Sequence, residues 1–178
     1  MIRNIAFRRN STVDFSCLSR QSLVWISSNA LADMPDVTAQ AIIEQLELER
    51  HPEGGWYRET WRADAAPGER ASATAIFFLM EDGQSSHWHR VDAAEIWLWH
   101  AGVSLTLSMA PDEQGPVRHV TLGPDVLNGH TVQALVPPGQ WQAAKPDNGW
   151  SLISCVVSPG FEFSGFDLAP PGWKPGNG

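Results

Sequence analysis

The feature that most constrains this fold is a long series of short β-type segments after residue 55. Residues 103–109 alternate apolar and polar side chains, which predicts a strand with one buried and one polar face. Residues 73–80 are apolar except for Thr74, as in a strand that is buried on both faces. Further strand-type segments lie at 56–62, 131–136 and 150–157. Turns rich in Gly, Pro and Asn separate them, so we expect eight to ten short strands.

One helix is expected before these strands. Residues 36–50 have helical character, with Asp36 or Thr38 as the N-terminal cap and an apolar stripe of Ile42, Ile43 and Leu46. The chain does not alternate strand and helix, which argues against a parallel α/β fold. The pattern therefore predicts an all-β, antiparallel sandwich or barrel with a short N-terminal helix.

Residues 1–33 differ in composition from the rest of the chain. They hold four arginines and two aspartates, are rich in Ser and Asn, and show no clean period. We expect a poorly structured extension. One interpretation is that translation truly starts at Met34 and that these residues are an over-extended start; the other is a leader that resembles a transit peptide. The first is favoured. One domain is then expected over residues 34–173, followed by a tail at 174–178.

Charge and cysteine content limit the classes of partner. The chain has 178 residues and a formal charge of −8, which argues against nucleic-acid binding and against a polybasic membrane-surface protein. No apolar run reaches the roughly 18–20 residues that span a bilayer. The two cysteines, Cys17 and Cys155, form no recognisable framework of disulfides. We therefore expect a cytoplasmic protein with a small-molecule ligand and neither nucleic-acid nor membrane partners.

The densest chemistry lies between residues 83 and 102. His87 and His89 are two residues apart, so a regular strand would present both imidazoles on one face, and Glu95 begins the next strand. Two imidazoles and a carboxylate can hold a divalent metal such as Zn, Fe, Ni or Mn, or can act as acid and base. Trp97 and Trp99 share the face of Glu95 and predict either an aromatic pocket wall or core packing.

These residues resemble the first motif of the cupin superfamily, in which Gly, His-x-His and Glu are followed after six residues by a second Gly. Pro137-Pro138-Gly139 resembles the second motif, and Gln142 stands where that motif places its last metal-binding His. A longer series of segments resembles one uncharacterised cupin family, catalogued as a domain of unknown function. The segments are His-Pro-Glu-Gly-Gly-Trp-Tyr-Arg-Glu-Thr at 51–60, and those at 72–76, 87–90, 95–97 and 137–143.

The resemblance implies a cupin jelly roll, an antiparallel double-stranded β-helix, that forms a homodimer. It is related in shape to sugar-nucleotide epimerases and to plant seed-storage proteins. Because this fold hosts many unrelated activities, the reaction must be inferred from the site. In the epimerases a His acts as base and a Tyr as acid, which makes Tyr57 a candidate acid here.

Three functions follow as hypotheses. The first is an enzyme of isomerase or epimerase type acting on a sugar-like or carboxylate-bearing metabolite. In it His87 or His89 is the base, Glu95 is its orienter or acid, and Arg58 or Arg90 anchors the substrate. The second is a metal-dependent oxygenase or lyase that uses His87, His89 and Glu95, with Gln142 in place of the last His. The third is a non-catalytic metabolite or sugar binder. In each, Trp97, Trp99 and Gln142 are expected to line the pocket. No role is assigned to His51, His119 or His130.

Overall fold

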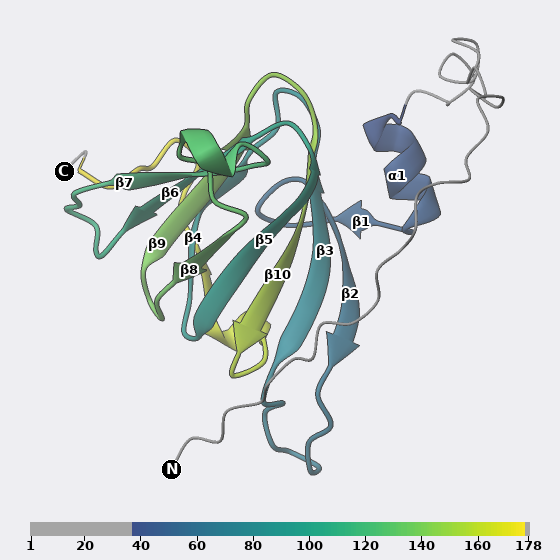
Figure 1. The fold of residues 1–178 in the computed structure, drawn as a ribbon. Coiled ribbons are helices and arrows are strands. Elements are labelled where there is room, and N and C mark those ends of the chain that lie inside the picture. Colours follow the sequence, from purple (N-terminus) through teal and green to yellow (C-terminus); the bar gives the residue numbers. More distant parts are fainter. Residues whose placement is uncertain (1–36, 177–178) are drawn as a thin grey trace, which may run out of the picture. The chain divides into compact units, whose positions relative to one another are not determined.

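The structure is a computed structural model that describes residues 37–176 (Figure 1). Two β-sheets face each other, and every pairing between their strands is antiparallel. The six-stranded sheet has the order β1-β2-β3-β10-β5-β8, and the five-stranded sheet has the order β11-β4-β9-β6-β7. The prediction of an all-β antiparallel fold with one short helix is confirmed.

The elements of the chain have the following bounds. The helices are α1 Ala39–Gln45 and the short 3-10 turns η2 Val126–Asn128 and η3 Phe163–Gly165. The strands are β1 Glu49–Arg50, β2 Trp56–Arg62, β3 Thr74–Met80, β4 Ser86–Val91, β5 Ala94–Gly102, β6 Leu105–Ala110, β7 Arg118–Leu122, β8 Gln133–Val136, β9 Trp141–Pro146, β10 Ser151–Ser158 and β11 Phe166–Leu168. The described residues thus hold eleven strands rather than eight to ten. The shortest, β1 and β11, have two and three residues, too few to show a period.

The helix is shorter than the predicted span 36–50. It starts after Thr38, whose side chain accepts a hydrogen bond from the Ala41 N–H at 3.2 Å, as expected of a cap. It ends where Glu47 adopts a left-handed φ of 53° and the Leu48 N–H donates to the Ile43 carbonyl at 2.9 Å. This reversal frees Glu49–Arg50 to pair with β2, so the charged end of the predicted helix is a strand.

The hydrophobic core fills one end of the space between the sheets. Its buried members are Phe78, Met80, Trp97, Leu105, Leu107, Met109, Leu122, Val136, Ala144, Ile153 and Cys155. Along β10 the inward side chains run from Ile153 in this core to Val157, which pairs with Thr74 of β3 and Glu95 of β5. Val157, Thr74 and Glu95 line a cavity instead of the core. The sandwich is therefore packed at one end and hollow at the other.

A second apolar cluster attaches α1 to the outer face of the six-stranded sheet. Ile43 and Leu48 pack on Leu79 of β3. The predicted extension 1–33, and residues 177–178 of the predicted tail, lie outside the described residues. Within residues 37–176, none of the helices has both the length and the apolar character that a membrane crossing requires.

Candidate functional site

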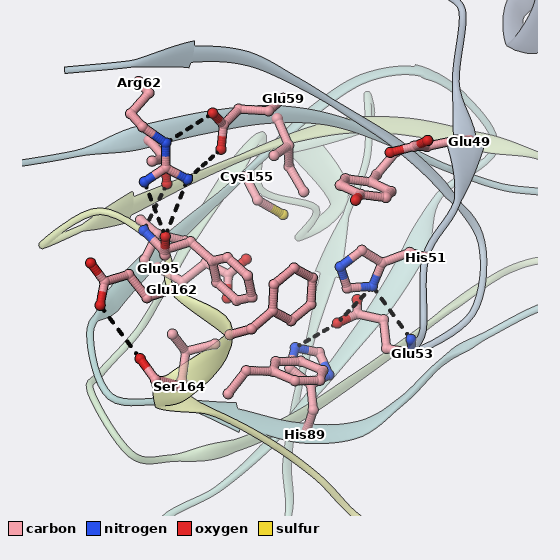
Figure 2. Close-up of a pocket in the computed structure, with 18 residues that line it drawn as sticks. Glu49, His51, Glu53, Glu59, Arg62, His89, Glu95, Cys155, Glu162 and Ser164 are labelled. Carbon is pink, nitrogen blue, oxygen red and sulfur yellow. Dashed lines mark hydrogen bonds and ion pairs between the residues drawn. The ribbon is translucent and has the colours of Figure 1, made fainter. Parts of the chain in front are cut away.

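The hollow end of the sandwich is a pocket of about 480 Å³ (Figure 2). Polar side chains form its floor and aromatic rings form much of its wall. The lining residues are Glu49, His51, Glu53, Tyr57, Glu59, Arg62, Thr74, Ile76, His89, Val91, Glu95, Cys155, Val157, Phe161, Glu162, Phe163, Ser164 and Phe166. They come from both sheets and from the segment 161–166, so the pocket exists only in the folded chain.

A tight turn at residues 51–55 carries Glu53 into this pocket. Gly54 has a φ of +111°, and a side chain there would collide with the backbone oxygen of Ser85, so the turn can approach β4 closely only with glycine. The Glu53 carbonyl accepts a hydrogen bond from the His87 N–H at 2.8 Å, which fastens the turn to β4. The Glu53 side chain is consequently 8% exposed and faces the floor.

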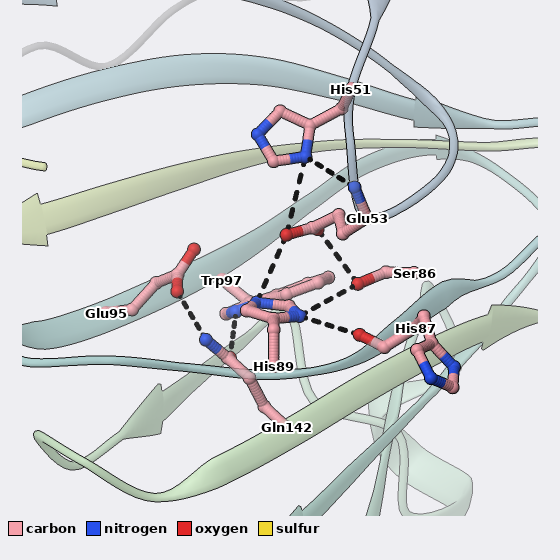
Figure 3. Close-up of polar contacts among 8 residues, drawn as sticks. All are labelled: His51, Glu53, Ser86, His87, His89, Glu95, Trp97 and Gln142. Atoms are coloured by element: carbon pink, nitrogen blue, oxygen red, sulfur yellow. Dashed lines mark hydrogen bonds and ion pairs between the residues drawn. The ribbon is translucent and has the colours of Figure 1, made fainter. Parts of the chain in front are cut away.

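Glu53 is the centre of a buried polar cluster (Figure 3). Its Oε1 accepts a hydrogen bond from the Ser86 hydroxyl at 2.8 Å. Its Oε2 lies 3.3 Å from Nε2 of His89 and 3.4 Å from Nδ1 of His51. Burial raises the pKa of Glu53 to about 7, and the neighbouring His51 and Ser86 reduce this effect. This carboxyl group is therefore poised to gain or lose a proton near neutral pH.

The hydrogen bonds of His89 determine which of its nitrogens carries the proton. Its Nδ1 lies 2.8 Å from the His87 carbonyl, an acceptor only, so Nδ1 is protonated. In the neutral ring Nε2 is then a lone pair facing Oε2 of Glu53 at 3.3 Å, so a protonated Glu53 can donate to it. Burial lowers the pKa of His89, which favours the neutral ring. Glu53 and His89 thus form an acid–base pair that shares a proton.

His51 belongs to the same cluster and was missed by the sequence analysis. Its side chain is 7% exposed, and its ring meets that of Tyr57 edge to face with centroids 4.6 Å apart. The Glu53 backbone N–H donates to Nδ1 at 3.4 Å, which places the proton of the neutral ring on Nε2. Nε2 has no hydrogen-bond partner among the residues that the structure describes, and it faces the pocket (Figure 2). Burial lowers the pKa of His51, with an opposing effect of Glu53.

Glu95, Gln142 and Trp97 form a fixed chain of hydrogen bonds beside the cluster. The Trp97 indole N–H donates to Oε1 of Gln142 at 2.9 Å, and Nε2 of Gln142 donates to Oε2 of Glu95 at 2.6 Å. The indole can only donate, so the orientation of the amide is determined. Burial raises the pKa of Glu95, and His89 opposes this shift. Gln142 therefore positions Glu95 from behind and does not itself line the pocket.

His89, Glu95 and Tyr57 line the pocket, as the sequence analysis expected, but His87 does not. The register between β4 and β9 is irregular. Ser86 pairs with Ala144 and His89 pairs with Gln142, so three residues along β4 correspond to two along β9. This bulge adds one residue and turns the His87 ring away from the pocket, where Nε2 lies 3.0 Å from the Pro170 carbonyl. The expectation that His87 and His89 share a face assumed a regular strand.

The two predicted anchoring arginines also lie outside the pocket. Arg58 contacts Glu47 at 3.3 Å, on the face of β2 opposite Tyr57. Arg90 binds Asp167 at 2.8 Å and Glu113 at 3.2 Å. The arginine that does line the pocket is Arg62, which the sequence analysis did not single out.

The predicted tryptophan wall lies elsewhere too. Trp97 is fully buried in the core, and Trp99 packs against that core. The indole N–H of Trp99 donates to the Val103 carbonyl at 3.0 Å. The aromatic wall is formed instead by Tyr57 and by the three phenylalanines of the segment 161–166. The three phenylalanines lie beside or within η3 and at the start of β11, elements too short to show a periodic pattern.

The expected metal donors are not brought together. Within residues 37–176 no group of three His, Cys, Asp or Glu side chains is arranged to hold a metal ion. His87 faces away, and the Gln142 oxygen already accepts from Trp97. His89 directs Nε2 at Glu53 rather than at a point shared with Glu95. These side chains do not fit the three-histidine and one-glutamate donor set that the cupin motifs imply.

Comparison with known proteins identifies relatives over most of the chain. The profile of the Cupin superfamily (DUF985) matches residues 40–169. An uncharacterised protein of Saccharomyces cerevisiae, YML079W, is 30% identical over 151 residues, which are 72% of this chain and 74% of the yeast protein. Protein SO0799 from Shewanella oneidensis has 41% identity and a TM-score of 0.71 over 75% of this chain and 85% of its own. A hypothetical protein from Leishmania major has 34% identity and a TM-score of 0.68, covering 77% of this chain and 90% of its own.

A more distant similarity links the fold to an enzyme. Oxalate decarboxylase of Bacillus subtilis, a protein with Mn(II) centres, has 17% identity and a TM-score of 0.52. The match covers 69% of this chain and 30% of the decarboxylase. At this identity the similarity shows the shared fold alone.

Proposed function

The chain belongs to the DUF985 family of the cupin superfamily, and on that premise we propose that it is an acid–base enzyme of isomerase or epimerase type. Its substrate is a small polar metabolite held in the pocket between the sheets. The observation that carries the proposal is the contact at 3.3 Å between Oε2 of Glu53 and Nε2 of His89 on the pocket floor. The two groups share one proton, and the pKa of Glu53 is about 7.

Such a pair can both remove and return a proton. A general acid or base works best when its pKa lies near the working pH, and this condition holds for Glu53. In the proposed reaction Glu53 or His89 takes a proton from a carbon next to a carbonyl group of the substrate. The electron pair of the C–H bond moves onto the carbonyl oxygen. After the abstracted proton has exchanged with solvent, a proton from the pair is delivered to the opposite face or to a neighbouring carbon, so no oxidant or reductant is consumed.

His51 and Tyr57 supply hydrogen-bond donors for the oxygen that gains charge. The His51 ring presents Nε2–H to the pocket, and the neutral form dominates because burial lowers its pKa. The pKa of Tyr57 is raised by its removal from water and by its hydrogen bond to Glu49, so the phenol stays protonated, and its O–H turns from Glu49 to the substrate when the substrate binds. Donors aimed at a developing oxyanion commonly provide a large part of catalysis in a site that excludes water.

Two other chemistries receive less support from the pocket. The Cys155 thiol lies at the pocket, but burial and Glu95 raise its pKa well above the ordinary value, so it is a poor nucleophile. The alternative of a metal-dependent oxygenase or lyase requires donors that do not converge here. Acid–base chemistry without a covalent intermediate is the remaining use of these side chains.

Hydrogen–deuterium exchange tests the proposal because it detects proton removal from carbon whatever the product is. The protein is incubated in D₂O with mixed aldoses, ketoses and amino sugars, and loss of carbon-bound proton signals is followed by NMR. Wild-type protein is expected to exchange at least one member. Glu53→Gln and His89→Asn are each expected to lower that rate about 100-fold or more, the usual contribution of a general acid or base.

The matched control is Glu81→Gln. Glu81 is also partly buried and hydrogen-bonded, accepting from the Trp56 indole at 2.8 Å, but it lies outside the pocket lining. The control is expected to exchange at the wild-type rate. Ligand binding without exchange would make the protein a metabolite binder, and exchange that survives Glu53→Gln would refute the assigned pair.

A further inference from the structure

The lining of the pocket is strongly acidic. Five of its residues are glutamates, and Arg62 is the one Lys or Arg among the lining residues that the structure describes. Glu53 and Glu95 are buried at the floor, whereas Glu49, Glu59 and Glu162 are exposed and therefore lie at the mouth. An anionic ligand would have to pass these mouth carboxylates and would find little opposite charge inside.

Arg62 offers little to an anion because four of its five N–H donors are already used. Its Nε and Nη2 donate to the two oxygens of Glu59 at 3.0 Å and 2.7 Å. Its Nη1 and Nη2 also donate to the Phe161 carbonyl at 3.2 Å and 3.3 Å. The guanidinium thus neutralises Glu59 and ties β2 to the segment 161–166. Among residues 37–176 Glu49 and Glu162 form no ion pair, and the cation that interacts with Glu162 from a distance, Arg70, is itself paired with Asp92.

Aromatic rings accompany one of the mouth carboxylates, because Glu162 lies between Phe161 and Phe163 in the chain, whereas Phe166 packs against His51 and His89. The ring centroid of Phe161 lies 5.1 Å from that of Phe163 and 5.8 Å from that of Phe166. Phe163 is 59% exposed, so its ring is accessible to a ligand. Aromatic faces attract ammonium and guanidinium groups, and rings beside carboxylates make a site for organic cations.

The floor indicates what the other end of the ligand carries. The His51 side chain is 7% exposed, and its Nε2–H has no hydrogen-bond partner within the described part of the chain. Figure 2 shows this nitrogen directed into the pocket. Among the described residues this nitrogen is not one of the fully buried polar atoms without a partner, so solvent reaches it and its N–H is free to donate to a ligand oxygen.

We propose that the pocket selects a small organic cation, an amine or ammonium compound whose other end bears a hydroxyl or carbonyl oxygen. The cationic end lies among Phe161, Phe163 and Glu162, and the oxygen accepts from His51. This inference deepens the proposed function, because it names the substrate class of the same pocket. It narrows the substrate expected from the sequence to amine-bearing compounds, amino sugars included, and disfavours a carboxylate-bearing metabolite, since no free cation in the described lining would hold a carboxylate.

A charge-graded ligand series tests the inference by calorimetry or NMR titration at about pH 6, where Glu53 is largely protonated. One series is choline, its neutral carbon isostere neohexyl alcohol, and the anion tert-butylacetate. The other is glucosamine, glucose and glucuronate. In at least one series we expect the cation to bind about 10-fold more tightly than the neutral compound, and the anion not to bind measurably. Equal or tighter binding of the neutral or anionic member, or no binding of either cation at tens of millimolar, would overturn the inference.

Two variants separate recognition of charge from simple apolar contact. Phe163→Leu keeps an apolar side chain but removes the ring, and Glu162→Gln removes a charge at the mouth. Each is expected to weaken cation binding about 3- to 10-fold while leaving the neutral isostere unchanged. The control Glu69→Gln makes the same charge change at an exposed residue outside the pocket and is expected to have no effect. Equal weakening of both ligands by Phe163→Leu would contradict recognition of a cation.

The outcomes also distinguish this inference from the proposed reaction. Cation binding without deuterium exchange would refute the reaction and leave the ligand class standing. Deuterium exchange on a neutral or anionic compound alone would refute the ligand class and leave the reaction standing. Glu53→Gln should abolish exchange while retaining cation binding, because Glu53 lies at the floor and the cationic end lies at the mouth.

Discussion

On folding, the Glu53 carboxyl group loses its contact with water. It is buried instead beside the Ser86 hydroxyl and the imidazoles of His51 and His89. Its pKa of about 7 means that the folded state prefers the protonated form far more than the unfolded chain does. A group whose pKa rises on folding stabilises the protein fully below its unfolded pKa of 4.5, and this contribution is lost as pH rises through about 7. His51 and His89, whose pKa values fall on folding, act in the opposite direction below their ordinary value of 6.5.

Glu53→Gln should therefore become more favourable relative to wild type as pH rises. Between about pH 5 and about pH 8 the difference in free energy of unfolding should move in favour of the variant by on the order of 2–3 kcal/mol. Urea denaturation of both proteins at each pH measures this difference. Glu81→Gln serves as the reference substitution. A constant difference across this range would mean that Glu53 is ionised throughout.

Gln142→Leu should destabilise the protein by about 2–3 kcal/mol. The substitution keeps a side chain of similar size but leaves the Trp97 indole N–H and the Glu95 carboxylate without their partner in a buried site. Thermal or chemical denaturation provides the measurement. Gln133→Leu, at an exposed position of β8, should change stability by less than about 0.5 kcal/mol. Equal effects of the two substitutions would contradict the role assigned to the amide.

The residues of the site were only partly predictable from the sequence. His89 and Glu95 were found because their residue types and motif suggested a site, and Tyr57 because epimerases of this fold use a Tyr as acid. His51 and Glu53 were missed because they lie on a turn, and its approach to β4 depends on tertiary packing at Gly54. Residues 51–60, which contain both, were nevertheless part of the family resemblance. The motif was therefore visible in the sequence, but nothing in its pattern indicated that these side chains enter a pocket.

At the scale of elements, strands were easier to predict than their irregularities. Period-two alternation and apolar runs gave β2, β3, β6 and β10 almost to their ends. They could not show the bulge in β4, because an inserted residue changes the pairing of two strands without changing their composition. The helix was overextended for a related reason. Its last charged residues have good helical propensity, but backbone pairing with β2 outweighs propensity there.

The end of α1 can be improved by one substitution. Glu47 holds a φ of 53°, a conformation that costs a residue with a Cβ atom about 1 kcal/mol and costs glycine almost nothing. Glu47→Gly should therefore raise the free energy of unfolding by about 0.5–1 kcal/mol, as measured by chemical denaturation. Glu44→Gly, inside the helix, should lower it by a similar amount. Destabilisation by both substitutions would argue against the left-handed end.

For the whole molecule, the fold followed from the sequence while the content of the pocket did not. Two facing antiparallel sheets were predicted from three observations. Apolar and polar residues alternate along the strands, strands do not alternate with helices, and the chain resembles cupins. Which side chains enter the cavity depends on a loop and a turn that carry no period. The homodimer implied by the resemblance stays a prediction, which sedimentation velocity would test.

A metal should contribute little to the stability of this molecule. The donors that the cupin motifs imply do not converge, so we expect chelator treatment, or added Zn²⁺ or Mn²⁺, to change Tm by no more than about 1 °C. A ligand present at about 100 times its Kd would instead stabilise the folded state by about 2.7 kcal/mol. Differential scanning calorimetry measures the shift. A rise of several degrees that disappears in His89→Asn would show that His89 turns toward a metal.

Substitutions at the packed end of the sandwich and at its hollow end should be tolerated differently during evolution. Substitutions among Phe78, Trp97 and Leu107 remove buried surface and are selected against whatever the protein binds. Substitutions in the loop 161–166 alter the rings around an open volume and sacrifice little burial. Specificity can therefore drift quickly on a scaffold that barely changes, and relatives that superimpose closely on this chain need not share its substrate.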